Sequence, residues 1–394
     1  MIKRNPNMSS LKRSYLFPEI NVRKKQFLAL NKEASLISLG IGDTTEPIPK
    51  SITDYLTRAS ERLGTSVGYS GYGLEQGMLE LREKIAATIY HNQIPSSDIF
   101  ISDGAKCDLG RLQILFGNDV SIAVQDPTYP VYTDGSIIAG VKSIISMPCN
   151  PENDFFPDLS ALPRTDLIYF CSPNNPTGAV ATKAQLTSLV NMAKANRSII
   201  IFDAAYSHYI QDDDLPKSIY EIEGAKEVAI EINSFSKLAG FTGVRLGWSV
   251  VPSELMYEDG CSVRDDWMRL VSTIFNGASN IAQYGGCAVL ENKGFVEVSA
   301  LTKFYLENAK LLRTALVSLG HEVYGGVHAP YVWVRFKGQK SWDVFQSILE
   351  KYHIVTTPGS GFGLMGEEFI RFSAFGARKS ITMAIERLLL NLQM

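Results

Sequence analysis

The sequence contains few of the residues that bind metals or form disulfide bonds. Among its 394 residues are 5 histidines and 5 cysteines, and the His-Glu-x-x-His spacing of metal hydrolases does not occur. The cysteines are scattered, odd in number and never spaced as Cys-x-x-Cys. That pattern argues against disulfide bonds and structural zinc, and it favours a reducing compartment. We therefore expect a cytoplasmic protein without a metal site.

Long apolar runs and a strong net charge are also missing. No stretch approaches the ~20 apolar residues needed to cross a bilayer, and the N-terminal segment lacks the apolar core of a secretory signal. The formal net charge of -3 gives no general electrostatic attraction to nucleic acid. Basic residues gather near the N-terminus, and we interpret them as a solvated face rather than an anion-binding arm. We expect neither a membrane nor a nucleic acid as a partner.

The middle of the chain shows the pattern of a parallel sheet. The apolar content of 45% and charged content of 20% are typical of a globular protein. Four short runs, at 120–124, 167–171, 199–202 and 228–232, are apolar at nearly every position, as expected of strands buried on both faces. Helix-like stretches such as 182–196 lie between them, and another, 105–116, precedes the first run. We predict a doubly wound α/β domain.

The last hundred residues have a different order of elements. We predict one long amphipathic helix at 295–319, ended by Gly320. Strands at 331–336, 354–356 and 369–373 follow, with one helix among them and another at the end. This order predicts a smaller α+β domain. The predicted divisions are an arm plus part of the small domain at 1–45, a large domain at 46–288 and a small domain at 289–394.

Polar residues follow the ends of the apolar runs in the large domain. Asn174 and Asn175 follow the second run, Asp203 ends the third, and Lys237 comes shortly after the fourth. Ligands of open parallel sheets bind beyond the carboxyl ends of the strands. If the sheet is parallel, these side chains lie at one edge and form one site.

Lys237 and its neighbours have the composition of a pyridoxal 5'-phosphate (PLP) site. A lysine in this place can form a Schiff base with the aldehyde of PLP and, once displaced, move the substrate's α-proton. Ser234, Ser236 and Arg245 suit a phosphate dianion. A lone lysine in a loop is more often a surface residue, so the assignment depends on these neighbours.

A second element suited to phosphate occurs at the start of a predicted helix. Gly104, Ala105 and Lys106 begin the helix-like stretch 105–116. The backbone N–H groups at a helix N-terminus bind phosphate without a special side chain. The alternative, an ordinary helix cap, is about as plausible from the sequence alone.

The remaining candidates would hold the cofactor ring and the substrate. Asp203 would pair with the pyridinium nitrogen, and Tyr206 and Asn175 would hydrogen-bond the phenolic oxygen. Tyr129 would stack on the ring, and Arg371 would bind the substrate's α-carboxylate through two hydrogen bonds. Each has an alternative: a structural aspartate, a turn at Asn175, a packed core tyrosine, or an arginine on the wet face of an edge strand.

Taken together, these residues resemble the fold-type I PLP-dependent aminotransferase family. The resemblance covers nearly the whole chain and rests on Asn175-Pro176-x-Gly178, Asp203-x-x-Tyr206, Ser234-x-Ser236-Lys237, Arg245 and Arg371, in that order. It implies the α/β fold of that family, with a large domain built on a mostly parallel, doubly wound sheet and a smaller α+β domain. It also implies ping-pong amine transfer through Lys237.

Further motifs are similar to those of the LL-diaminopimelate aminotransferase family. They are the segments 41–45, 71–77, 102–106, 126–130 and 275–278. That family interconverts LL-2,6-diaminopimelate and tetrahydrodipicolinate, with 2-oxoglutarate and glutamate as the second pair, in the biosynthesis of lysine and peptidoglycan precursors. The resemblance implies a homodimer with shared active sites. It also implies that the substrate is bound by Tyr15, Gly42, Tyr72, Glu75, Lys106, Tyr129, Asn175, Asn276 and Arg371, with Tyr15, Tyr72, Glu75 and Asn276 reaching into the partner's site.

The difference between the two amino substrates at their distal ends suggests a role for Glu75. Diaminopimelate carries an ammonium and a carboxylate at its distal end, whereas glutamate carries only the carboxylate. We expect Glu75 to accept a hydrogen bond from the distal amine, while Lys106 and Asn276 donate to the distal carboxylate. The alternative for Glu75 is a carboxylate that stabilises a helix N-terminus.

Three other functions remain open at this point. One is an aminotransferase for aspartate, alanine or aromatic amino acids, and another is a PLP-dependent C–S lyase. Stoichiometric formation of pyridoxamine phosphate would distinguish transamination from a lyase reaction. The third is a non-catalytic regulator with this fold, which is the least expected because no helix-turn-helix pattern precedes the domain.

Overall fold

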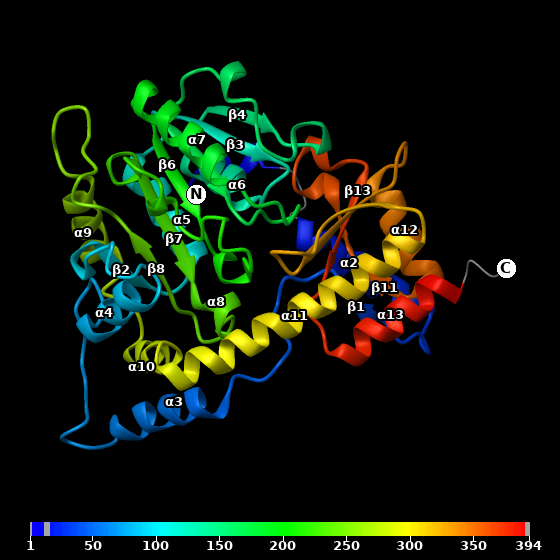
Figure 1. Ribbon diagram of the computed structural model, residues 1–394, viewed down its shortest axis with the longest axis horizontal. Coiled ribbons are helices and arrows are strands. Elements are labelled where there is room, and N and C mark those ends of the chain that lie inside the picture. Colours follow the sequence, from blue (N-terminus) through cyan, green and yellow to red (C-terminus); the bar gives the residue numbers. More distant parts are fainter. Residues whose placement is uncertain (1, 12–15, 391–394) are drawn as a thin grey trace.

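The computed structural model describes residues 2–11 and 16–390, and a seven-stranded sheet forms its larger part (Figure 1). The strand order is β2-β8-β7-β6-β5-β3-β4. Neighbouring strands from β7 to β4 run parallel, whereas β8 is antiparallel to both β7 and β2. The strands are β2 (Ile99–Ser102), β3 (Ser121–Asp126), β4 (Ser143–Pro148), β5 (Leu167–Cys171), β6 (Ile199–Asp203), β7 (Ala229–Ser234) and β8 (Gly247–Val250).

The four predicted central strands are β3, β5, β6 and β7, within one or two residues at each end. All of β5 is buried, as its continuous apolar run predicts. Three strands were not predicted. β4 is an edge strand with several exposed positions, so its sequence lacks a continuous apolar run. β2 and β8 are four residues each, and β8 begins two residues after Arg245, the last residue of the predicted phosphate motif.

Helices cover both faces of this sheet. Buried residues of α4 (Leu79–Thr88), α7 (Lys183–Asn196) and α10 (Asn280–Val289) belong to the core on one face. Buried residues of α5 (Ala105–Phe116), α6 (Val131–Ala139) and α9 (Val263–Ile274) belong to the core on the other. The chain therefore has the predicted doubly wound α/β architecture.

The C-terminal part contains a four-stranded antiparallel sheet in the order β12-β13-β10-β9. Its strands are β9 (Glu322–Gly325), β10 (Tyr331–Arg335), β12 (Thr357–Pro358) and β13 (Phe369–Ser373), and α12 (Ser341–Tyr352) and α13 (Arg378–Leu390) pack on it. The strand predicted at 354–356 corresponds to β11 (Ile354–Val355), which pairs with β1 (Ile37–Ser38) outside the four-stranded sheet. β12 follows it, was not predicted, and joins the four-stranded sheet by pairing with β13.

One long helix connects the two sheets (Figure 1). α11 (Asn292–Ser318) begins beside α10 and reaches β9 and β10, close to the predicted range of 295–319. From the N-terminal side, α2 (Leu16–Leu30) packs into the core of the small sheet, and α3 (Lys50–Arg62) packs on α10. The divisions at residues 45 and 288 stay a prediction.

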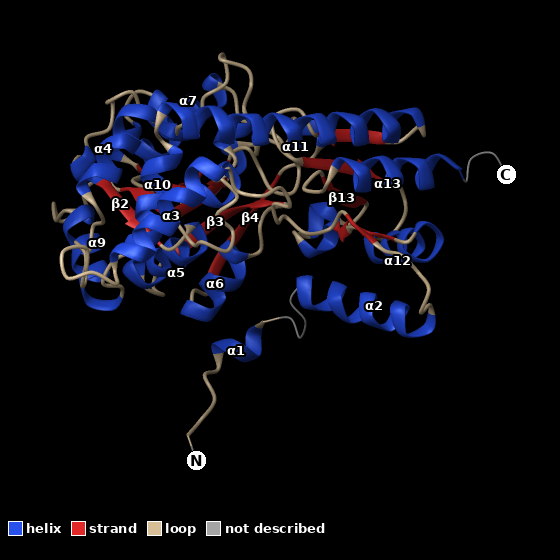
Figure 2. Ribbon diagram, turned by 90° about the horizontal axis from the view of Figure 1, so that it is seen from below, coloured by secondary structure: helices blue, strands red, loops and turns tan. Residues whose placement is uncertain are grey.

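The N-terminal segment lies against the large sheet's helices (Figure 2). Its short helix α1 (Asn7–Ser10) contacts α6, and the Asn7 side chain donates a hydrogen bond of 3.2 Å to the carbonyl of Ile138. The segment otherwise projects from the body of the chain in this view. None of the residues of α1 is buried.

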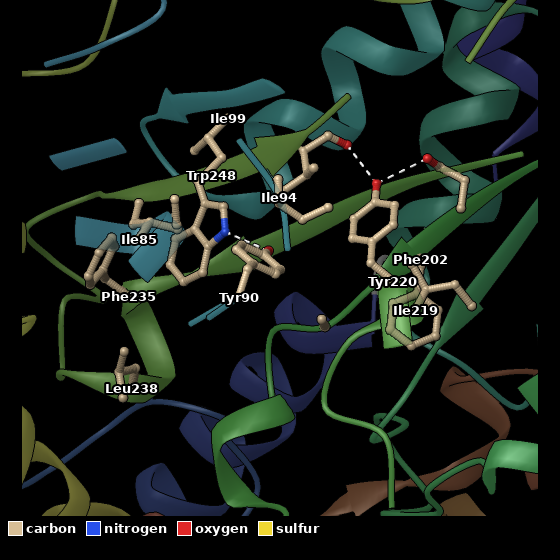
Figure 3. Close-up of a cluster of buried hydrophobic side chains, with 14 of the residues drawn as sticks. Ile85, Tyr90, Ile94, Ile99, Phe202, Ile219, Tyr220, Phe235, Leu238 and Trp248 are labelled. Carbon is tan, nitrogen blue, oxygen red and sulfur yellow. Dashed lines mark hydrogen bonds between the residues drawn. The ribbon is translucent and has the colours of Figure 1, made fainter. Parts of the chain in front are cut away.

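A buried polar network joins Trp248 of β8 to Glu231 of β7 through Tyr90. The Trp248 indole donates to the Tyr90 hydroxyl at 2.9 Å (Figure 3). That hydroxyl in turn donates to Glu231 at 2.7 Å. The Ser218 hydroxyl and the Ile219 N–H also donate to Glu231. Burial raises the pKa of Glu231 to about 7, against the opposing effect of these hydrogen bonds. The network orients the two strands that carry Ser234 and Gly247.

Candidate active site

A cavity of about 460 Å³ lies at the carboxyl ends of the parallel strands. The strand ends and the turns that follow them supply most of its walls, as expected for an open parallel sheet. Twelve of the residues predicted from the sequence line it. They are Gly42, Ala105, Lys106, Tyr129, Asn175, Asp203, Tyr206, Ser234, Ser236, Lys237, Arg245 and Arg371.

Lys237 reaches the cavity from a single turn of helix that follows β7. This turn is α8 (Phe235–Leu238), and the Ser234 hydroxyl caps it by accepting a hydrogen bond from the Ser236 N–H at 3.0 Å. The ammonium of Lys237 donates to the carbonyl of Gly42. Burial, with smaller contributions from the nearby cations of Arg371, Arg245 and Lys106, lowers the pKa of Lys237 to about 8, while the Asp43 carboxylate opposes this shift. A neutral amine is therefore accessible near physiological pH.

The predicted phosphate elements meet at one end of the cavity. Gly104 adopts φ +123° where α5 begins, and a Cβ placed there would lie 2.4 Å from Nη2 of Arg245. Gly247 of β8 allows this approach, since its own Cβ would lie 3.0 Å from the Gly104 Cα. Arg245 has φ +66° and donates to the Thr242 carbonyl at 3.1 Å. A guanidinium, two hydroxyls and a helix N-terminus thus face one small volume, which suits a phosphate.

Asp203 lies 5% exposed at the end of β6, and its hydrogen bonds come from the protein. The Tyr132 hydroxyl donates to Oδ2 at 2.7 Å, and the Ala205 N–H donates to Oδ1 at 3.0 Å. Burial raises the pKa of Asp203, and these two donors oppose the rise. Tyr132 was not predicted. It lies in the first turn of α6 (Val131–Ala139), and its partner Asp203 is 71 residues away, so no local motif indicated this pairing.

Arg371 is buried without a carboxylate partner among the described residues. It is 1% exposed in β13, between β12 and β10, so the alternative of a wet edge strand is wrong. Its guanidinium donates to Asn175 Oδ1 and to the Gly40 carbonyl, each at 2.6 Å. Nε has no partner in the described part of the chain. A buried cation bonded only to neutral groups favours an anionic ligand.

Tyr331 is a second site residue that the sequence did not predict. Its hydroxyl lies 2.6 Å from the Tyr206 hydroxyl, and its ring lies under the Arg371 guanidinium at 4.3 Å. A Cβ on Gly42 would lie 2.3 Å from the Tyr331 oxygen, so the chain passes this tyrosine only with glycine. Tyr331 belongs to β10, far from the other motifs in sequence.

Three predicted substrate residues lie outside the cavity. Tyr72, Glu75 and Asn276 are exposed, and the first has 90% of its surface accessible. Their two segments contact each other: a Cβ on Gly277 would lie 2.9 Å from the carbonyl of Leu74. A fourth, Tyr15, lies outside the described residues. Within this chain the structure does not bring these residues to Lys237.

The described residues contain neither a metal-binding cluster nor a membrane-spanning helix. No cluster of three or more histidine, cysteine, aspartate or glutamate side chains there has the arrangement of a metal site. Among the described helices, none combines the length and apolar character required for a transmembrane span.

Comparison with known proteins gives a family for the chain. The model of the family "Aminotransferase class I and II" matches residues 34–388. LL-diaminopimelate aminotransferase of Protochlamydia amoebophila is 54% identical, over 98% of this chain and 97% of that protein. The chloroplastic LL-diaminopimelate aminotransferase of Arabidopsis thaliana is 55% identical, over 98% of this chain and 86% of that protein.

A solved structure agrees in fold. L,L-Diaminopimelate aminotransferase from Chlamydomonas reinhardtii superposes with a TM-score of 0.96 at 55% identity, covering 99% of this chain and 98% of that one. The fold class predicted from the sequence, and the family resemblance on which it rested, are confirmed. The chain belongs to the class I and II aminotransferase family.

Proposed function

We propose that this protein is a PLP-dependent aminotransferase acting on LL-2,6-diaminopimelate, with 2-oxoglutarate and glutamate as the second substrate pair. The observation that carries the amine-transfer chemistry is the convergence on one cavity of Lys237, whose pKa is lowered to about 8, and the buried Arg371. The names of relatives at 54% and 55% identity over 98% of the chain support the substrate.

The residues of the cavity fit PLP. Ser234, Ser236, Arg245 and the N–H groups that begin α5 would hold its phosphate, because Gly104, without a Cβ, lets the Arg245 guanidinium lie close to the start of α5. Asp203 lies among the buried strand ends, where it would face the pyridine nitrogen. Asn175 and Tyr206 would contact the phenolic oxygen, and Tyr129 would cover the ring. When bound, PLP supplies an aldehyde that exchanges with amino groups and a ring that withdraws electrons from the substrate's Cα–H bond.

The chain's own residues then orient the substrate and move its proton. Arg371 and Asn175 bind the α-carboxylate, and the guanidinium needs no reorganisation because Gly40 and Asn175 already hold it. Lys237 accepts the α-proton at Nζ and returns it, since its lowered pKa makes the neutral amine available. Asp203 stays ionised when a cationic group pairs with it.

The distal end of the substrate requires residues that this cavity lacks. We propose that Tyr15, Tyr72, Glu75 and Asn276 serve the partner's cavity in a homodimer. The stretch of chain from Val67 to Glu75, which includes Tyr72, carries exposed apolar side chains, with Val67 at 94% and Leu74 at 59%, as expected of a surface that a second copy covers. Glu75 accepts from the distal amine, and Lys106 and Asn276 donate to the distal carboxylate. Gly42 leaves room beside Tyr331.

The test is a comparison of amino donors with the purified protein and 2-oxoglutarate. We expect strong preference for LL-diaminopimelate over the meso isomer, aspartate, alanine and tyrosine, with no turnover by Lys237→Ala. Glu75→Ala should lower the turnover of diaminopimelate more than that of glutamate. Robust turnover of aspartate or tyrosine without diaminopimelate would overturn the substrate assignment. Equal losses in Glu75→Ala would overturn the role of Glu75.

A further inference from the structure

Two amide side chains at the start of α10 join the exposed segments that carry Tyr72, Glu75 and Asn276. Gln283 is 1% exposed, although it is polar. Its Oε1 accepts from the Met78 N–H at 2.7 Å, and its Nε2 donates to the Ala278 carbonyl at 2.9 Å. One side chain therefore attaches the end of the 70–78 segment to the 276–278 segment.

Asn280 attaches the other end of the 70–78 segment. Its Nδ2 donates to the Ser70 hydroxyl and to the Gly71 carbonyl, each at 3.1 Å. Its Oδ1 accepts from Gln283 Nε2 at 3.4 Å, so the two amides are themselves connected. Both ends of the loop that contains Tyr72 and Glu75 are thus held by residues three positions apart on one helix.

Glycines allow the close approach that these hydrogen bonds need. Gly77 has φ +96°, and a Cβ there would lie 3.0 Å from Gln283 Oε1 and 2.4 Å from the Cβ of Ile101. A Cβ on Gly73 would lie 2.9 Å from Asn280 Oδ1. The loop is consequently held against α10 rather than loosely attached. α10 in turn packs in the large core, so the clamp has a rigid base.

We propose that Asn280 and Gln283 are positioning residues that set the selectivity for the distal end of the substrate. This inference rests on the proposed function, in which Glu75 and Asn276 contact that end. Neither amide lines the cavity of Lys237. Their loss should disturb the distal contacts and leave the phosphate and α-carboxylate contacts in place. Diaminopimelate, which has two charged distal groups, should suffer more than glutamate, which has one.

The experiment compares Asn280→Ala and Gln283→Met in the PLP-loaded protein. We expect kcat/KM for LL-diaminopimelate to fall by roughly ten- to a hundred-fold, mainly through KM, and that for glutamate by a much smaller factor. Gln113→Met is the matched control. Gln113 is another buried amide, and it joins α5 to α6 instead. Any loss in this control should be alike for both donors.

Hydrogen–deuterium exchange supplies a readout that needs no substrate. Amides of the 70–78 segment, Met78 above all, should exchange faster in both variants, while those of α5 stay unchanged. Unchanged exchange, or equal losses for both donors, would overturn the proposal. If Gln283→Met does not fold, the same two measurements on Asn280→Ala test the proposal, because Asn280 is more exposed than Gln283. A wild-type protein inactive on diaminopimelate would refute the proposed substrate, and the exchange result would still confirm or refute the clamp.

Discussion

The hydroxyl of Tyr132 donates a hydrogen bond of 2.7 Å to the buried carboxylate of Asp203. The two residues are 71 positions apart, on α6 and at the end of β6. Burial raises the pKa of Asp203, whereas this hydrogen bond lowers it. Tyr132 therefore favours the ionised form of the carboxylate that we propose faces the cofactor nitrogen.

Tyr132→Phe should remove the hydrogen bond to Asp203 while keeping the aromatic ring packed in the core. Hydrogen bonds to charged groups contribute about 1.5–3 kcal/mol, so we expect kcat to fall by about ten-fold or more and the acid limb of its pH profile to move to higher pH. Tyr169→Phe is the control, because the Tyr169 ring stacks on Tyr132 at 5.5 Å and its hydroxyl does not bond Asp203. Equal effects of the two substitutions on the pH profile would contradict this role.

Gly104→Ala should impair cofactor binding through the backbone. The new Cβ would occupy the place of the Arg245 guanidinium, and φ +123° is strained for any L side chain, at a cost of about 1–3 kcal/mol. We expect the dissociation constant for PLP to rise about ten-fold or more in an absorbance titration. Gly110→Ala, in the middle of the same helix and with open space around its Cβ, should bind PLP normally and melt no lower than the wild type.

The reactivity of Lys237 should depend on pH with a midpoint near 8. Burial lowers its pKa from 10.5 to about 8, so the neutral, nucleophilic amine predominates above that pH. Competitive acetylation of the cofactor-free protein, followed by mass spectrometry of the Lys237 peptide, measures this midpoint. Arg245→Gln removes a neighbouring cation that disfavours the ammonium, and it should raise the midpoint. A midpoint close to 10.5 in the wild type would show that burial does not lower the pKa of the Lys237 amine.

Glu231 should make the protein less stable as the pH rises. Burial raises its folded pKa from 4.5 to about 7, so its contribution to stability is fully present below pH 4.5 and is lost as the pH rises through about 7. Each unit of difference corresponds to about 1.4 kcal/mol, so the contribution changes by up to roughly 3 kcal/mol. Urea unfolding at pH 5 and pH 8 should show Glu231→Gln losing less stability than the wild type on going to pH 8. A pH-independent difference between the two proteins would refute this.

The helices and strands that a local sequence pattern defines were predicted more accurately than those that depend on pairing with distant segments. α5 and β13 have the predicted bounds, because a turn glycine precedes one and a short apolar run defines the other. β2 and β8 could not be recognised, since each has four residues and its antiparallel pairing joins segments far apart in the chain. The strand predicted at 354–356 is β11, which pairs with β1 near the N-terminus, whereas the next two residues, Thr357 and Pro358, pair with β13. No local sequence pattern indicates which strand each of these segments pairs with.

The same distinction applies to the site. Lys237, Asp203 and Ser234 were predictable because each lies at or shortly after the carboxyl end of a buried strand, where parallel sheets place ligands. Tyr331 was not, because its partner Tyr206 is 125 residues away and the pairing depends on how β10 approaches β6. The Asn280 and Gln283 clamp was missed for a similar reason: Gln283 and Met78 are 205 residues apart. Residues whose role depends on contacts with distant parts of the chain cannot be recognised from a local sequence motif.

The covalent attachment of PLP to Lys237 tests the account most directly. Purified protein should be loaded with PLP, reduced with borohydride, digested and mapped by mass spectrometry. The account predicts near-stoichiometric modification of the peptide that contains Lys237, and none of that peptide in Lys237→Ala. A protein that stays unmodified, or that carries the label on another lysine, would contradict it.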